Sequence, residues 1–203
     1  MKTLLSLFDY TGNWALPFAK GGWNVIMIDK KHSPNYFDIH KDIMNISADY
    51  FYEYIFDNFD TIDGILAAVP CTDFAVSGAR WFVDKDKSGQ TQKSIELVYQ
   101  TLKIIDLCMP DFWVIENPIS RIHNLIPEIG KPKMYFNPCD YGDPYTKKTA
   151  LYGNFNTNLK LNPVLPLYGS KMHTMYGGKS ERTKELRSET PMGFANAFYN
   201  ANK

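Results

Sequence analysis

Two short segments of the chain carry residues that could take part in covalent chemistry. Cys71 follows the apolar run 65–69, and Glu116 follows the apolar run 112–115. If both runs are parallel strands of one sheet, their carboxyl ends face the same crevice, where open α/β sheets bind ligands. A thiol and a carboxylic acid would then meet at one substrate, with the thiol as nucleophile. Asn117 could orient either group.

Each of these residues also has a plainer interpretation. A free cysteine is more often a small buried hydrophobic residue, and this suits Cys108, on the apolar face of a predicted helix, and also Cys139. Cys71 differs because it leaves a strand between Pro70 and polar neighbours. The Glu-Asn-Pro sequence alone would be a cap at the start of a helix. Three scattered cysteines predict neither a disulfide framework nor a zinc site, so a reducing, cytoplasmic setting is expected.

The elements that must position these residues alternate between strands and helices. Buried strands are predicted at 3–8, 24–28, 65–69 and 112–115, and helices at 14–20, 48–59, 92–109 and 191–200. This alternation indicates an α/β fold with a mostly parallel sheet. After Pro118 the pattern changes, with short strands at 134–136 and 149–152 around the turn 141–144. Residues 153–187 lack apolar periodicity and are predicted to be loop-like.

The composition fits a globular domain, with 44% hydrophobic and 22% charged residues in 203. No segment reaches the roughly 20 apolar residues that cross a bilayer, and the N-terminus lacks the features of a signal peptide. The net charge is zero but uneven. Residues 1–130 hold 11 Lys/Arg and 17 Asp/Glu, a net of −6, and residues 131–187 hold 10 and 4, a net of +6. An acidic half suits a cationic cofactor and a basic half a polyanion, although chance asymmetry of solvated side chains would look the same.

The first predicted strand, turn and helix form the place where Rossmann-type folds receive a nucleotide. Gly12 is the one glycine in this turn, so the GxGxxG pattern is absent. Asp29 ends the second strand, where a carboxylate could accept from both ribose hydroxyls, and Asp42 could accept from an adenine amino group. Each aspartate alone is more often a cap or turn residue. The three features in order indicate an adenosine-type ligand.

The order of these motifs resembles that of the DNA cytosine-5 methyltransferases, in a compact form like those that phages encode. The matching segments are 7–14 (Leu-Phe-Asp-Tyr-Thr-Gly-Asn-Trp), Asp29, Asp42-Ile43, 70–74 (Pro-Cys-Thr-Asp-Phe), 116–118 (Glu-Asn-Pro), 141–149 (Tyr-Gly-Asp-Pro-Tyr-Thr-Lys-Lys-Thr) and the tail 187–195. The resemblance implies a Rossmann-like, S-adenosylmethionine-dependent methyltransferase fold with helices on both faces of the sheet. It also implies a catalytic and cofactor-binding domain (1–152), a small basic recognition-like module (153–187) and a C-terminal segment (188–203) that returns to the catalytic domain.

The resemblance further implies a reaction. Cys71 would add to C6 of a cytosine flipped out of double-stranded DNA, while Glu116 hydrogen-bonds or protonates N3. C5 would then take the methyl group of S-adenosylmethionine and lose its proton. The implied catalytic residues are Cys71, Glu116, Asn117 and Lys147, which stands where the family has an arginine, and no metal is implied.

The other residues that the resemblance marks fall into two sets. Those expected at the cofactor are Phe8, Asp9, Tyr10, Thr11, Gly12, Asn13, Trp14, Asp29, Asp42, Ile43 and Pro70. Those expected to contact DNA phosphates are Lys148, Lys171, Lys179, Arg182, Lys184 and Arg187.

The chain also departs from the family pattern. Tyr10 and Asn13 occupy positions where glycines are usual, and Thr149 stands where a second arginine is usual. Only the 35 residues 153–187 are left for target recognition. One alternative is therefore a DNA- or cofactor-binding protein that lacks catalysis, or that depends on a protein partner or second copy to recognise its target. Another is the same chemistry on RNA, a free nucleotide or single-stranded DNA. The expected location is the cytoplasm of a bacterial or phage-infected cell, with restriction-modification as one role.

Overall fold

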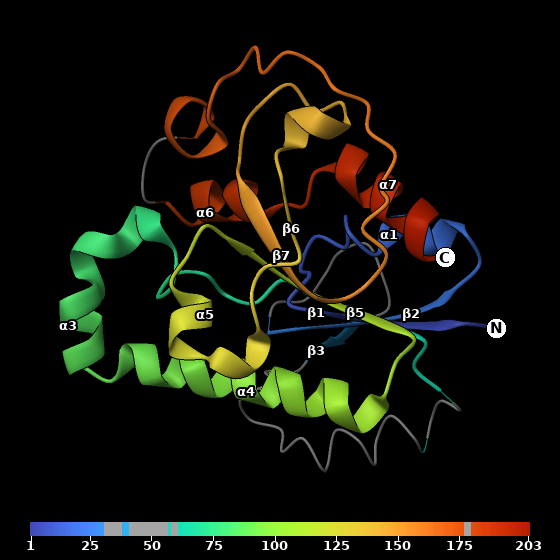
Figure 1. Cartoon of the computed structure of the whole chain (residues 1–203), viewed down its shortest axis with the longest axis horizontal. Helices are drawn as coiled ribbons and strands as arrows, with labels where there is room; N and C mark the ends of the chain where they lie inside the picture. Colours follow the sequence, from blue (N-terminus) through green and yellow to red (C-terminus); the bar gives the residue numbers. More distant parts are fainter. Residues whose placement is uncertain (31–37, 41–56, 58–60, 177–179) are drawn as a thin grey trace.

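The fold is a seven-stranded sheet with helices packed against it (Figure 1). The computed structural model describes residues 1–30, 38–40, 57, 61–176 and 180–203. The expectations placed on Asp42, Ile43, Lys179 and most of the helix 48–59 lie outside these residues. Within them, no helix has the length and apolar character needed to cross a membrane.

The strands and helices have the following bounds. The strands are β1 (Thr3–Leu7), β2 (Asn24–Asp29), β3 (Asp38–His40), β4 (Gly64–Ala67), β5 (Phe112–Pro118), β6 (Met134–Phe136) and β7 (Thr149–Asn154). The α-helices are α1 (Leu16–Lys20), α3 (Phe82–Lys87), α4 (Gln90–Cys108), α5 (Ile122–Leu125), α6 (Glu181–Ser188) and α7 (Met192–Asn202). Shorter helical segments are η2 (Val76–Trp81), η3 (Pro127–Ile129), η4 (Pro138–Tyr141) and the π-helical η5 (Lys171–Met175).

The order of the strands places a ligand crevice between β1 and β4. The sheet runs β3-β2-β1-β4-β5-β7-β6, and the first five strands are parallel. The chain moves outward from β1 to β3 and then returns to the other side of β1 as β4, so the direction of winding reverses there. Ligands of open α/β sheets bind at the carboxyl ends of the strands that flank such a reversal. The predicted α/β fold with a mostly parallel sheet is confirmed, and β7 is antiparallel to both of its neighbours.

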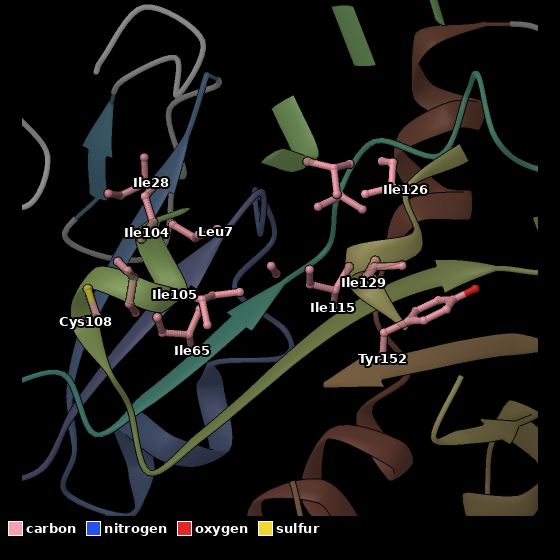
Figure 2. Close-up of a cluster of buried hydrophobic side chains, with 14 of the residues drawn as sticks. Leu7, Ile28, Ile65, Ile104, Ile105, Cys108, Ile115, Ile126, Ile129 and Tyr152 are labelled. Carbon is pink, nitrogen blue, oxygen red and sulfur yellow. The ribbon is translucent and has the colours of Figure 1, made fainter. Parts of the chain in front are cut away.

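Alternating side chains of the central strands build two hydrophobic layers. Leu4, Leu66 and Val114 point into the layer that contains Trp14 and residues of α1 and α7. Their neighbours in sequence point to the opposite face, because successive side chains of a strand alternate. There Ile65 and Ile115 pack in one cluster with Ile104 and Ile105 of α4 (Figure 2). Helices therefore cover both faces of the sheet, as predicted.

The structure differs from the predicted elements in the second half of the chain. The prediction that 153–187 is loop-like is wrong for residues 181–187, which lie in α6. Ser180 caps this helix, its Oγ accepting a hydrogen bond of 3.2 Å from the Thr183 N–H. The residues of α6 are almost all polar, so no apolar periodicity marked it. Strand β7 crosses the expected domain boundary at 152/153, and the division into domains stays a prediction.

Candidate active site

Backbone hydrogen bonds hold the segment that contains Cys71 against the segment that follows Glu116. Strands β4 and β5 pair in parallel, and the segments that leave them continue side by side. Ala75 forms an isolated bridge with Ser120, and the Val76 N–H donates to the Ile119 carbonyl at 3.0 Å. The two strand ends therefore lie side by side at one edge of the sheet, as predicted.

Strand β7 brings a third predicted catalytic residue, Lys147, to this place. It pairs antiparallel with β5, with Thr149 opposite Pro118, so Lys147 arrives beside the end of β5. The Lys147 Nζ lies 3.8 Å from the Glu116 Oε1. Only 10% of the lysine side chain and 12% of the glutamate side chain are exposed. The ion pair is therefore shielded from solvent, which strengthens its interaction over that of a surface pair.

Burial and two charges set the state of the Cys71 thiol. Burial raises the pKa of Cys71 above its ordinary value. The positive charge of Lys147 opposes this shift, and the negative charge of Glu116 adds to it. Both groups therefore act on the sulfur, and the resting thiol is protonated at neutral pH. The thiolate is the form that attacks carbon. The fraction of Cys71 in this form depends on the opposing charges of Lys147 and Glu116.

Asn117 supports the strand end from which Cys71 emerges. Its side chain is fully buried, and its Nδ2 donates to the Val69 carbonyl at 3.4 Å. Its Oδ1 is buried and has no hydrogen-bond partner among the described residues. A buried polar atom without a partner is costly, so this oxygen has unused capacity to accept a hydrogen bond. The position fits the orienting role predicted for Asn117.

Lys171 lies at the active site and not on an outer surface. A bridge between Thr146 and Ser170 places it there, and the Lys171 N–H donates to the Thr146 carbonyl at 2.9 Å. Its side chain is buried, with the ammonium 5.1 Å from the centre of the Tyr145 ring and 3.4 Å from the Glu189 carbonyl. Burial, reinforced by the charge of Lys147, lowers the pKa of Lys171 to about 8. This position argues against the predicted phosphate contact.

The other predicted DNA contacts differ in how far their side chains are exposed. Lys148, Arg182 and Lys184 are exposed. Arg187 instead donates from its guanidinium to two carbonyls, those of Met172 at 3.0 Å and of Tyr176 at 2.8 Å. It therefore braces the η5 segment that carries Lys171. Phosphate contact stays a prediction for the exposed three.

The turn after β1 is built around the buried carboxylate of Asp9. This carboxylate accepts hydrogen bonds from the Ser6 hydroxyl at 3.0 Å and from the Ala15 N–H at 3.3 Å. Burial raises the pKa of Asp9 to about 6, and the charge of Asp29 at the end of β2 adds to the shift. Gly12 has a φ of +69°, a conformation that suits glycine. Asp9 therefore holds the turn together from within, and Asp29 lies close enough for its charge to act on Asp9.

The remaining predicted cofactor residues do not all face the crevice between β1 and β4. Half-buried side chains in the turn are Phe8, Tyr10, Thr11 and Asn13, and Pro70 is exposed at the end of β4. Trp14 is fully buried, with its ring centre 6.0 Å from that of Phe194 and 5.7 Å from that of Phe198. The structure thus places Trp14 in the core beneath the turn, which it supports without reaching the crevice.

Two solved structures of methyltransferases share this architecture. One, described as a DNA modification methyltransferase encoded within an E. coli prophage, aligns with a TM-score of 0.56 and 17% identity over 81% of this chain and 53% of its own. Another, the Entamoeba histolytica methyltransferase EhMeth, aligns with a TM-score of 0.53 and 17% identity over 81% and 57%. At this identity the likeness shows the fold alone, that of Rossmann-like S-adenosylmethionine-dependent methyltransferases. The chain spans little more than half the length of these structures.

The family follows from the sequence profile. The profile of the C-5 cytosine-specific DNA methylases matches residues 2–123, more than half of the chain. The chain belongs to this family, whose methyl donor is S-adenosylmethionine. No curated protein sequence shows a significant match.

The crevice fits the charge of that donor. S-adenosylmethionine carries a sulfonium and an ammonium group, and both are cationic. The carboxylates of Asp9 and Asp29 lie close enough for one to raise the pKa of the other. A cation placed between them would relieve this repulsion. The residues present therefore suit the cofactor of the family.

Proposed function

We propose that this protein transfers a methyl group to C5 of cytosine in DNA through a covalent adduct with Cys71. The observation that carries the proposal is the position of the Cys71 thiol beside the Lys147–Glu116 ion pair, next to the β1/β4 crevice. Cytosine C5 is a weak nucleophile, and addition of a thiolate to C6 makes it enamine-like. A nucleophile, an acid and a cofactor crevice in one place fit this chemistry.

The chain's own residues account for formation of the covalent adduct. The Cys71 sulfur forms a bond to C6, and the electron pair of the C5–C6 double bond becomes available at C5. Glu116 is ionised in the resting ion pair, so it first takes up the proton that the Cys71 thiol loses and then donates it, or a hydrogen bond, to N3, which stabilises the charge that develops on the ring. After methylation, transfer of the C5 proton to water restores the double bond and breaks the bond between sulfur and C6, which releases the Cys71 thiolate. Lys147 favours the thiolate at both ends of this cycle.

S-adenosylmethionine would supply the electrophilic methyl group. We propose that the backbone of the Gly12 turn holds its methionine end and that Asp29 accepts from the ribose hydroxyls. Asp9 acts by bracing the turn, because its carboxylate already accepts two hydrogen bonds from the protein.

The substrate is proposed to be double-stranded DNA from which the target cytosine is flipped out, since Cys71 cannot reach C6 of a stacked base. Few exposed cations lie in the described part of the module, so phosphate contacts there give modest affinity. Target recognition by a protein partner or a second copy is consistent with this scarcity. The acceptor and the need for a partner are both open to direct measurement.

The first test is transfer of labelled methyl from S-adenosylmethionine to genomic DNA by the purified chain, followed by base-resolved mapping of 5-methylcytosine. Transfer is expected for the wild type and for Cys139→Ser, a matched control at another half-buried cysteine. Cys71→Ser should lose transfer while it still binds the cofactor. Undiminished transfer by Cys71→Ser would show that another group is the nucleophile.

A second test traps the adduct and identifies the acceptor. Oligonucleotides with 5-fluorocytosine cannot lose a proton from C5, so the adduct should persist as a species of lower mobility on a denaturing gel. Duplex DNA, single-stranded DNA and RNA would be compared, with duplex DNA expected to trap best. Preferential trapping on RNA or single strands would change the substrate without changing the chemistry. Absence of trapping on all three would favour a binding protein.

A further inference from the structure

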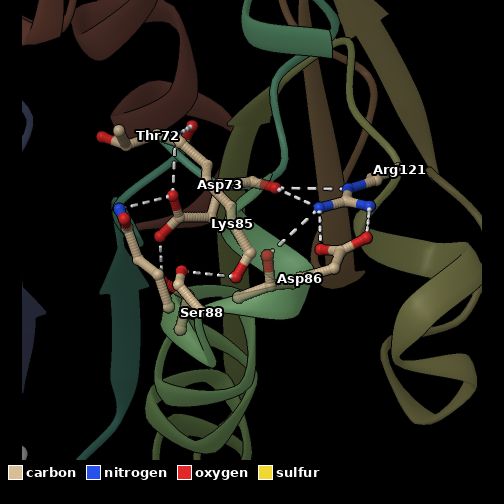
Figure 3. A network of polar contacts seen from close by, with 9 residues as sticks. Thr72, Asp73, Lys85, Asp86, Ser88 and Arg121 are labelled. Atoms are coloured by element: carbon tan, nitrogen blue, oxygen red, sulfur yellow. Dashed lines mark hydrogen bonds and ion pairs between the residues drawn. The ribbon is translucent and has the colours of Figure 1, made fainter. Parts of the chain in front are cut away.

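A buried aspartate, Asp73, two residues after Cys71, ties the Cys71 segment to α3 and α4. Asp73 accepts hydrogen bonds from Gln90 at 2.9 Å and from Ser94 at 2.6 Å, both at the start of α4. Its carboxylate also pairs with Lys85 of α3 at 2.8 Å, and the same ammonium donates to the Thr72 carbonyl (Figure 3). The side chain of Asp73 thereby fixes one side of the segment.

Arg121 holds the other side of this segment. Its Nε and Nη2 donate to the main-chain carbonyl of Asp73 at 3.3 and 3.1 Å. The same guanidinium forms a two-pronged ion pair with Asp86, at 2.9 and 2.7 Å, and lies 3.6 Å from the centre of the Phe82 ring (Figure 3). Nη2 also donates to Thr91 at 3.2 Å. A planar group with five donors can serve all of these partners at once, which a lysine cannot.

The contact matters because the turn that it holds contains the nucleophile. The Cys71 carbonyl accepts from the Phe74 and Ala75 N–H groups at 3.0 and 2.8 Å, so residues 71–75 form one turn. Arg121 lies five residues after Glu116 and binds the middle of that turn. Its guanidinium therefore bridges the two strand ends that carry the thiol and the acid.

We propose that Arg121 is a positioning residue that fixes the Cys71 sulfur relative to Glu116 and to the crevice. The proposal rests on the proposed role of Cys71 as nucleophile. Misplacement of a reacting group by about 1 Å can cost on the order of 100-fold in rate. Loss of the Arg121 contacts should therefore reduce turnover more than substrate binding.

The test compares Arg121→Met and Arg121→Lys with a matched control, Tyr99→Phe. Tyr99 of α4 donates to Glu128 at 2.9 Å, so this control also loosens α4 from the segment after β5 but leaves the turn 71–75 intact. Arg121→Met is expected to lower kcat by about 10- to 100-fold with KM for DNA changed less than threefold. Arg121→Lys should recover part of kcat, and Tyr99→Phe should match the wild type.

A measurement that does not need catalysis separates this proposal from the proposed function. The rate of alkylation of Cys71 by iodoacetamide, followed by mass spectrometry, reports the environment of the thiol in the folded protein. Arg121→Met should change this rate at least threefold, while the rate at Cys139 stays constant. If the wild type transfers no methyl group, the proposed function fails, and the alkylation result still decides whether Arg121 positions Cys71. Unchanged alkylation, or a kcat loss that Tyr99→Phe shares, would overturn the proposal.

Discussion

The ammonium of Lys147 lies 3.8 Å from the carboxylate of Glu116, and both charges act on the Cys71 thiol with opposite signs. The pair therefore links the two roles that the proposed reaction requires, a reactive sulfur and a group that would bind N3. Because the pair is largely buried, a change at either member should alter the thiol more than a surface charge would.

Replacement of Lys147 by Met should make Cys71 less reactive. Burial already raises the pKa of Cys71, and the lysine charge is the main opposing influence. Its removal should raise that pKa further, so that alkylation of Cys71 by iodoacetamide at pH 8 becomes slower. Lys147→Arg keeps the charge and is the control. The measurement is the rate of Cys71 alkylation as a function of pH. Identical profiles for Lys147→Met and the wild type would contradict the assigned interaction between Lys147 and Cys71.

Replacement of Lys171 by Met should make the protein more stable and less active. The pKa of Lys171 falls from its ordinary 10.5 to about 8 on folding, so below pH 8 its buried charge opposes folding. As pH rises from 8 toward 10.5 the folded state binds fewer protons than the unfolded state, and stability increases. Lys171→Met should therefore raise the free energy of unfolding at pH 7 by up to about 3 kcal/mol and remove this pH dependence.

The same variant should lose activity, because Lys171 lies beside Lys147 and Glu116. We expect methyl transfer to fall at least tenfold although the protein is more stable. Chemical denaturation at pH 7 and pH 10 and the transfer assay give the two readouts. A stabilised variant with full activity would show that Lys171 only fills space. Lys171→Arg controls for the charge.

The convergence of Cys71 and Glu116 could be predicted because parallel strands end at one edge of a sheet, and both residues follow apolar runs. Lys147 was marked only by the resemblance to the family, because it precedes a strand that runs antiparallel to β5. The position of Lys171 could not be predicted from the sequence. It depends on a bridge between Thr146 and Ser170, which lie in two irregular segments that no periodicity marks. Its charge alone suggested a surface role.

The turn after β1 shows a second limit. Residues 8–14 matched the family motif as one block, but the motif does not say which way each side chain points. The fold turns Asp9 and Trp14 inward, while Phe8, Tyr10, Thr11 and Asn13 stay half-buried. Contact of this segment with the cofactor stays a prediction, and the motif alone could not separate the inward side chains from the others.

Replacement of Asp9 by Asn should change how stability depends on pH. The pKa of Asp9 rises from 3.8 to about 6 on folding, so the buried acid favours folding while it is protonated. This contribution is complete below pH 3.8 and is lost as pH rises through 6. Relative to Asp9→Asn, the wild type should lose up to about 3 kcal/mol of stability between pH 4 and pH 7. Denaturation at a series of pH values measures this, and parallel curves would contradict the burial of the charge.

Gly12 and Trp14 stand two residues apart in the same motif, but only replacement of Gly12 should weaken binding of the cofactor. Gly12→Ala places a side chain at a φ of +69°, at a cost of about 1–2 kcal/mol, and blocks the approach of a ligand to the backbone. We expect at least a tenfold loss in affinity for S-adenosylmethionine by calorimetry. Trp14→Phe removes volume from the core and should cost less than the about 3–5 kcal/mol typical of truncation to Ala. Measured well below its melting temperature, this variant should bind the cofactor like the wild type. A tenfold loss of affinity in folded Trp14→Phe would instead place the indole at the ligand, against its packing on Phe194 and Phe198.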